Sequence, residues 1–288
     1  MKRGFTFLMS ALLFSLGASA DVLKIHSSFE SQTSPELTII KLADGRNAFW
    51  DRSDVTNVTL SELKEHKGMI QIDMDENQKV LALNLVNGFV DDEESRTTTS
   101  VGMVSRFELG YQPSILASYS VAQTVLNSFN TSTIEGAQCY DKAHRWVYDE
   151  HKAYATKLMK MFLFFSDDYI ARYTYPWWFH AAPFAYLRMN NETTERIMDP
   201  TFSQYPLKLK IWTDLFMKNK VECKSIDKYS GYSRNPQGGD CFIQRVSMYF
   251  WQPKDLEAFE NTGALKSNFI PWEIDWAYEH GFGTRKPQ

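Results

Sequence analysis

The chain has 288 residues, of which 43% are hydrophobic and 15% aromatic, and its formal net charge is −4. This composition excludes an intrinsically disordered chain and supplies enough apolar residues for a substantial core. A net negative charge also argues against nucleic acid as a partner, because binding to phosphates requires a basic surface.

The first twenty residues have the layout of a secretory signal peptide. Lys2 and Arg3 precede an apolar run over residues 5–16, and small residues lead to Ala20. We therefore predict cleavage after Ala20 and a secreted or periplasmic protein. No later stretch reaches the roughly 18 apolar residues of a transmembrane helix, so no membrane span is predicted.

Residues 37–90 read as a small α+β unit. The pattern predicts a strand at 37–40, a short helix after the Thr59/Glu62 capping box, and strands at 69–74 and 80–86. The acidic residues at 73–77 suggest a calcium loop. However, Gln78 and Asn84 stand where an EF-hand has glycine and glutamate, so a plain hairpin turn is predicted.

Residues 91–105 have almost no apolar content until Val101. An acidic cluster at 91–94 precedes a Ser/Thr-rich run that contains Arg96, a candidate processing site. We interpret this stretch as a linker, with a domain boundary near residue 105. It separates an N-terminal domain (21–105) from a second domain (106–288).

The second domain shows helical periodicity first and strand patterns later. Helices are predicted over 116–129 and from 140 to about 161. Short apolar or alternating runs at 161–165, 178–187, 195–198 and 242–251 predict strands. The expected fold class is α+β, with a helix packed on a mostly antiparallel sheet.

Three cysteines allow at most one internal disulfide. Cys223 and Cys241 enclose a polar, glycine-containing loop, which suits a bridge in an exported protein. Cys139 is then the free thiol.

Cys139 begins the second predicted helix, where the helix dipole and unpaired N–H groups favour the thiolate. A buried structural cysteine is the alternative. A thiolate nucleophile also needs a base and an orienting acid. His180 starts one predicted strand and Asp199 ends the next, so antiparallel pairing would bring them together. His144 is a rival base, but its helical position points away from the thiol.

The remaining candidates are weaker. Trp177, in the aromatic run before His180, is the one aromatic residue that we expect to line a side-chain channel to the thiol. No cluster of cysteine or histidine residues has the spacing of a zinc site, so neither a metal nor another cofactor is predicted.

Three segments together resemble the catalytic blocks of the bacterial protein glutaminase family. They are Gln138-Cys139-Tyr140-Asp141-Lys142-Ala143-His144, Trp177-Trp178-Phe179-His180-Ala181 and Glu195-Arg196-Ile197-Met198-Asp199-Pro200-Thr201. The resemblance spans roughly residues 115–260. It implies a papain/transglutaminase-like core with Cys139 as nucleophile, His180 as base and Asp199 as orienting acid. It also implies an inhibitory pro-region within residues 21–105.

The expected function is therefore that of an exported, monomeric cysteine hydrolase that deamidates accessible glutamine side chains of proteins or peptides, releasing ammonia through a thioester. A transglutaminase or cysteine protease could use the same triad. A catalytically inactive exported binding module is an alternative from another class. The family's several disulfides contrast with at most one here.

Overall fold

The computed structural model describes residues 21–31, 34–66, 69–86, 111–189, 192–233, 238–263 and 269–283. The predicted signal peptide, the linker with Arg96 and the boundary near residue 105 lie outside these ranges. Within them, no helix is long and apolar enough to cross a membrane.

The N-terminal part forms a five-stranded antiparallel sheet in the order β3-β2-β1-β4-β5. Its strands are β1 (Asp21–Glu30), β2 (Leu37–Leu42), β3 (Asn47–Asp51), β4 (Met69–Met74) and β5 (Val80–Val86). The predicted capping box is confirmed: Thr59 and Glu62 bond reciprocally at the start of α1 (Leu60–Glu65). The plain hairpin between β4 and β5 is also confirmed, with the Asp75 carboxylate accepting the N–H groups of Asn77 and Lys79.

The second sheet has the order β10-β11-β7-β8-β6, and β9 pairs with β8. Its strands are β6 (Ile115–Leu116), β7 (Met159–Phe165), β8 (Phe179–Met189), β9 (Glu192–Ile197), β10 (Lys224–Ile226) and β11 (Cys241–Ser247). The β11–β7, β7–β8 and β8–β9 pairs are antiparallel, whereas β10–β11 and β6–β8 are parallel. The mixed α+β class and the mostly antiparallel sheet agree with expectation.

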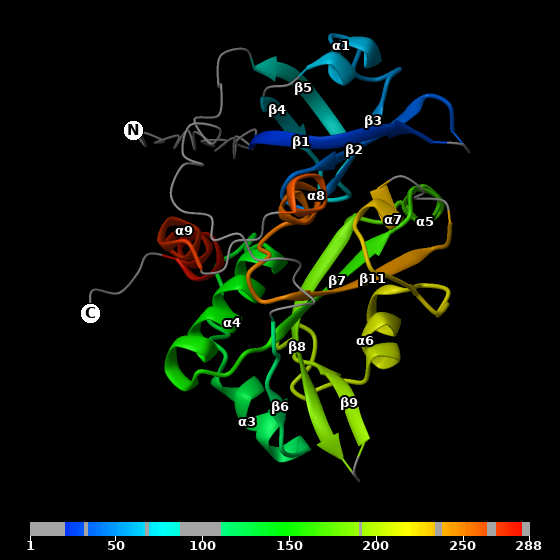
Figure 1. Ribbon diagram of the computed structural model, residues 1–288. Helices are drawn as coiled ribbons and strands as arrows, with labels where there is room; N and C mark the ends of the chain where they lie inside the picture. Colours follow the sequence, from blue (N-terminus) through cyan, green and yellow to red (C-terminus); the bar gives the residue numbers. More distant parts are fainter. Residues whose placement is uncertain are drawn as a thin grey trace, which may run out of the picture.

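Helices surround this sheet (Figure 1). They are α3 (Tyr119–Ser128), α4 (Cys139–Tyr154), α5 (Asp167–Tyr173), α6 (Leu209–Phe216), α7 (Ser230–Ser233), α8 (Pro253–Thr262) and α9 (Pro271–Phe282). The predicted end of the second helix near residue 161 was wrong. Ala155 adopts a left-handed conformation that ends α4, and the apolar run from Met159 is already strand, every residue of it buried.

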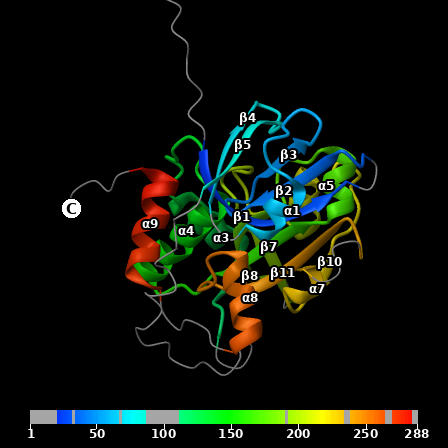
Figure 2. The ribbon, with the colours of Figure 1, turned by 90° about the horizontal axis from the view of Figure 1, so that it is seen from above.

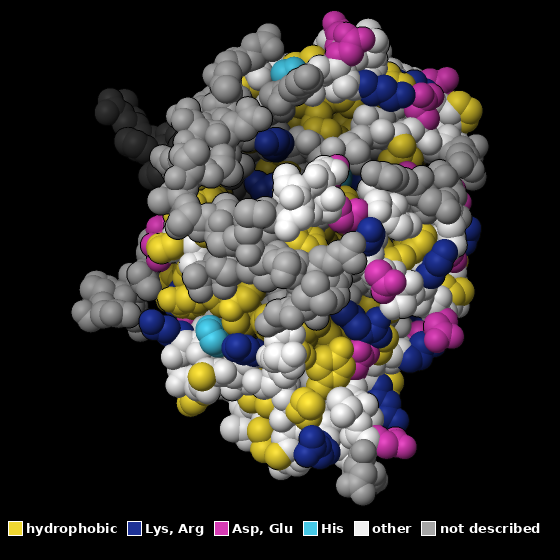
Figure 3. All heavy atoms as spheres, in the orientation of Figure 1, with side chains coloured by type: hydrophobic (Ala, Val, Ile, Leu, Met, Phe, Trp, Pro, Cys, Tyr) yellow, Lys and Arg dark blue, Asp and Glu magenta, His cyan; other side chains and the backbone are white. Residues whose placement is uncertain are grey.

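The two sheets pack against each other through a shared buried cluster, and the N-terminal sheet also has a hydrophobic cluster of its own. Ile39 of β2 and Phe49 of β3 belong to the same buried cluster as the inner residues of β7, β8 and β11. Seen from above, the N-terminal strands lie over the central strands of the second sheet (Figure 2). On the face shown in Figure 3, charged side chains of both signs are interspersed among hydrophobic patches. The N-terminal sheet therefore packs directly on the second sheet and does not lie apart from it.

Candidate active site

Cys139 is the first residue of α4. The N-cap residue Gln138 makes no side-chain cap bond, and its amide instead donates to the Gly136 carbonyl. Cys139 is half-buried and packs against the main core cluster, and it is the free cysteine of the described residues. The structure thus places a partly accessible thiol at a helix N-terminus, where the dipole favours the thiolate.

His180 and Asp199 meet in the interior. His180 is the second residue of β8, and its Nε2 lies 2.7 Å from Asp199 Oδ2. The Asp199 carbonyl accepts the N–H groups of Phe202 and Ser203, which forms a tight turn two residues after β9. Because β9 runs antiparallel to β8, this turn lies beside the start of β8.

The pKa of His180 indicates that Cys139 lies beside the imidazole as well as Asp199. Burial by itself lowers the pKa of this imidazole, but the negative charges of Asp199 and the Cys139 thiolate, with hydrogen bonds to both, raise the pKa to about 9. Such an effect requires both groups to lie beside the ring. The structure therefore brings the three residues predicted from the sequence into one site.

His144 is placed as predicted, away from this site. It is fully buried, its Nδ1 contacts the Lys160 ammonium, and its ring packs against Trp251 and Phe269. It is thus a core residue of α4 rather than a neighbour of the thiol.

Trp177 lies at the wall of the site. Its ring stacks on His180 with 6.0 Å between centroids and meets Phe202 edge-on. Phe202 also contacts the His180 ring edge-on at 5.3 Å and is 40% exposed. These two aromatic side chains border the imidazole on the way to solvent.

Sequence reasoning missed α6. The Trp212 indole Nε1 donates to Asp199 Oδ2 at 3.0 Å, and the Phe216 ring lies 4.6 Å from the His180 ring. The run Leu209–Phe216 has apolar residues at helical spacing, which could have indicated this helix. Nothing in that spacing pointed to Asp199.

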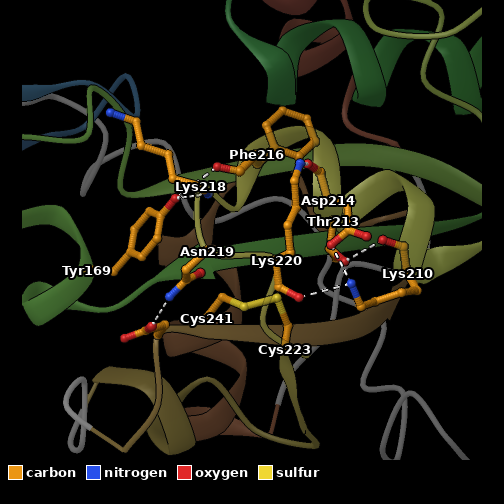
Figure 4. The surroundings of a disulfide bond; sticks show 11 residues. Tyr169, Lys210, Thr213, Asp214, Phe216, Lys218, Asn219, Lys220, Cys223 and Cys241 are labelled. Atoms are coloured by element: carbon orange, nitrogen blue, oxygen red, sulfur yellow. Dashed lines mark hydrogen bonds and ion pairs between the residues drawn. A yellow bond between two sulfur atoms is a disulfide. The ribbon is translucent and has the colours of Figure 1, made fainter. Parts of the chain in front are cut away.

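The predicted disulfide between Cys223 and Cys241 is confirmed. Figure 4 shows that it links the segment after α6 to the start of β11. In the same region, Asn219 donates to the Asp240 carboxylate at 2.5 Å. The bridge therefore fastens the chain that leaves α6 to the central sheet.

The turn between β2 and β3 lies against the site. The Asn47 N–H donates to the Pro176 carbonyl, and the Trp178 N–H donates to the Gly45 carbonyl. Arg46 forms an antiparallel bridge with Trp177. Burial raises the pKa of Tyr140 well above its usual value, and among the smaller influences Asp44 raises it further. The turn therefore reaches both the Trp177 segment and the first turn of α4.

No site for a metal is apparent in the described parts of the chain, where no three His, Cys, Asp or Glu side chains are grouped as ligands.

Comparison with known structures defines the class of fold. Pro-protein-glutaminase, in a crystal structure, covers 90% of this chain and 90% of its own at a TM-score of 0.52 and 11% identity. A mutant of pro-protein-glutaminase covers 91% of both chains at a TM-score of 0.53 and 11% identity. At this identity the likeness establishes a shared fold, and it extends over both sheets.

Residues 120–216 match the family model described as glutaminase, a segment that includes Cys139, His180 and Asp199. This match to part of the chain and the shared fold agree with the sequence resemblance to the protein glutaminases. The NMR structure of protein-glutaminase from Chryseobacterium proteolyticum covers 52% of this chain and 91% of its own at 13% identity and a TM-score of 0.32. A search of curated protein sequences gave no match.

Proposed function

We propose that the protein is an exported deamidase of protein glutamine side chains, with Cys139 as nucleophile, His180 as acid and base, and Asp199 as the residue that orients His180. The observation that carries this proposal is the buried His180–Asp199 pair beside a thiol at a helix N-terminus, all within the segment that matches the glutaminase model. The enclosing core would then be papain/transglutaminase-like.

The reaction follows from the charges of the site. Asp199 occupies Nε2 of His180, which leaves Nδ1 for Cys139. With its pKa raised to about 9, His180 carries its proton at neutral pH, and we propose that Cys139 reacts as the thiolate beside this imidazolium. The thiolate attacks the carboxamide carbon, and the imidazolium protonates the departing ammonia. Neutral His180 then takes a proton from water, which hydrolyses the thioester to glutamate and restores the thiol.

The tetrahedral intermediates need donors for their negative oxygen. The main-chain N–H of Cys139 is the first candidate, because the first N–H groups of a helix have no carbonyl partner within it. Aromatic walls formed by Trp177 and Phe202 would guide the glutamine side chain and exclude water beside His180.

We further propose that the N-terminal domain is an inhibitory pro-region. Its β2–β3 turn occupies the edge of the Trp177 segment through the bonds from Asn47 and to Gly45. A β-carbon on Gly45 would lie 3.0 Å from the Phe179 ring, so the turn fits closely next to His180. This turn would block a protein substrate until the linker is cut. Export through a signal peptide agrees with the disulfide, since such bonds persist in oxidising compartments.

The test is ammonia release from a glutamine-containing protein, measured together with peptide mass, before and after limited proteolysis between residues 87 and 110. We expect ammonia and a gain of about one dalton per modified site, increased by proteolysis. Cys139→Ala should reduce turnover by about 10⁴-fold or more without unfolding the protein. Cross-linked products or new amino termini in place of ammonia would instead indicate a transglutaminase or a protease.

A further inference from the structure

Asp199 lies outside regular secondary structure. It follows β9 by two residues, and the turn that holds its main chain leaves its carboxylate to be fixed by other groups. Two donors reach the same oxygen: His180 Nε2 at 2.7 Å and Trp212 Nε1 at 3.0 Å. Both side chains are buried. The indole and the imidazole therefore share one carboxylate oxygen.

Trp212 comes from α6, which also supplies Phe216 against the His180 ring. This helix has only eight residues, and its N-cap Lys208 makes no side-chain cap bond. A helix of two turns is not stable by itself, so its place depends on tertiary contacts.

Those contacts gather at its C-terminal end (Figure 4). Tyr169 of α5 donates its hydroxyl to the Phe216 carbonyl at 3.0 Å and accepts the Lys218 N–H at 2.8 Å. The disulfide then fixes Cys223 to the first residue of β11. The C-terminal end of α6 is therefore held by α5 through Tyr169, and the segment after it is held by β11 through the disulfide.

We propose that Trp212 is a positioning residue for the reaction, which holds the Asp199 carboxylate in the orientation that faces His180. The inference rests on the proposed function. A buried carboxylate that is held by a second N–H donor cannot turn away from the imidazole without losing that hydrogen bond. Without the indole N–H, Asp199 gains freedom to rotate, and His180 is less well oriented and less readily protonated.

The experiment compares the full chain with Trp212→Phe, which removes the donor and keeps an aromatic ring. Trp146→Phe is the matched control, because Trp146 is a buried tryptophan whose Nε1 donates at 2.7 Å to the Asn130 carbonyl, in a cluster that excludes the triad. We expect Trp212→Phe to lower kcat for ammonia release by about 10- to 100-fold with little change in KM. The kcat of the control should stay within about threefold of the wild-type value, because a neutral hydrogen bond contributes little net free energy.

The second measurement is the rate of Cys139 alkylation by iodoacetamide as a function of pH, which does not depend on deamidation. The His180 imidazolium stabilises the thiolate, so alkylation by this neutral reagent begins at the pH where the thiolate forms. In Trp212→Phe, where His180 is less readily protonated, this onset should move to higher pH. Two results would overturn the proposal. The first is a kcat of Trp212→Phe that is close to the wild-type value. The second is a lowered kcat together with an unshifted alkylation profile and a melting temperature that is reduced as much as in Trp146→Phe. If the wild type alkylates as expected but releases no ammonia, the proposed function fails and the positioning role stands.

If Trp212→Phe does not fold, the wild-type protein labelled with ¹⁵N at its indole groups supplies the decisive reading. The indole resonance that moves in Asp199→Asn should also move as His180 titrates between pH 7 and 10. An indole signal that is fixed through this range would contradict the proposal.

Discussion

At the scale of single residues, the site depends on charges held out of water. His180 and Asp199 are 3% and 2% exposed. In such surroundings a charge persists only when a partner compensates for its lost hydration. The protonation of His180 therefore depends on Asp199 and Cys139 beside it, and the pH dependence of activity should report this coupling.

If His180 acts as proposed, activity should fall above about pH 9, because loss of the His180 proton would remove the acid that expels ammonia. Asp199→Asn should move this alkaline limit to lower pH, since the charge that raises the pKa of His180 is removed. We also expect kcat to drop by several orders of magnitude, as in other triads whose acid is neutralised. The measurement is kcat/KM for ammonia release between pH 5 and 10.

Asp214→Asn is the control for this experiment. Asp214 lies on α6 and pairs with Lys210 near the surface, so its replacement removes a charge without touching the triad. An alkaline limit that is the same in Asp199→Asn and in the wild type would contradict the coupling.

At the scale of elements, α6 connects the disulfide to His180 and Asp199, the proposed catalytic pair. Trp212 and Phe216 face the site, and the segment after the helix carries Cys223. A covalent link in the segment that follows a short helix limits the movement of the helix and of the side chains that it carries.

Replacing both Cys223 and Cys241 with serine should lower the free energy of unfolding by about 3 kcal/mol, the usual effect of opening a loop of this length. Amide hydrogen exchange over residues 209–216 should become faster than in the wild type, while exchange in α4 changes little. Urea unfolding and exchange measured by mass spectrometry test the two parts separately. Unchanged protection of α6 would show that the Tyr169 hydroxyl bonds are sufficient to hold it.

The sequence analysis succeeded where a residue's role is set by its local pattern. Cys139 at a helix start and the Thr59 capping box are examples, because such features depend on neighbours within a few positions. The bond between Trp212 and Asp199 joins segments 13 residues apart through a turn and a short helix, and nothing in the spacing predicts which indole turns inward. The strand β1 was missed because its period is interrupted, and a register shift between Ile25 and Ser27 shows the irregularity.

At the scale of the whole molecule, the contact between the two sheets is charged as well as apolar. Lys41 of β2 pairs with Asp167 at the start of α5, and its ammonium also donates to the Tyr232 hydroxyl. His26 of β1 stacks on Trp178 at 4.3 Å, and its Nε2 lies 3.1 Å from the Tyr229 hydroxyl. These groups face one another across the interface.

Acid should weaken this interface. Burial, and then the charge of Lys41, lowers the pKa of His26 to about 4. The neutral ring therefore stabilises the docked sheet fully above its free pKa of 6.5, and this contribution is lost as the pH falls from 6.5 toward 4. In His26→Phe, which keeps the stacking but cannot be protonated, the loss of docking should begin at lower pH.

Hydrogen exchange of β1 and β2 at pH 7, 6, 5 and 4 measures the effect. The wild type is compared with His26→Phe. Lys41, Asp167, Tyr229 and Tyr232 also face the contact, but they are present in both proteins, so a difference in pH dependence is due to His26. Identical pH dependence in the two would mean that His26 does not control docking.

The shared core has a consequence for how the protein reaches and keeps its fold. If residues 21–86 leave after cleavage, Ile39 and Phe49 leave with them, and the rings around Trp178 lose their cover. The remaining part would then be less stable than the whole chain in which it folded. We expect the N-terminal sheet to assist the folding of the second domain. After cleavage, the second domain should stay folded because its barrier to unfolding is high, and not because its free energy of unfolding is large.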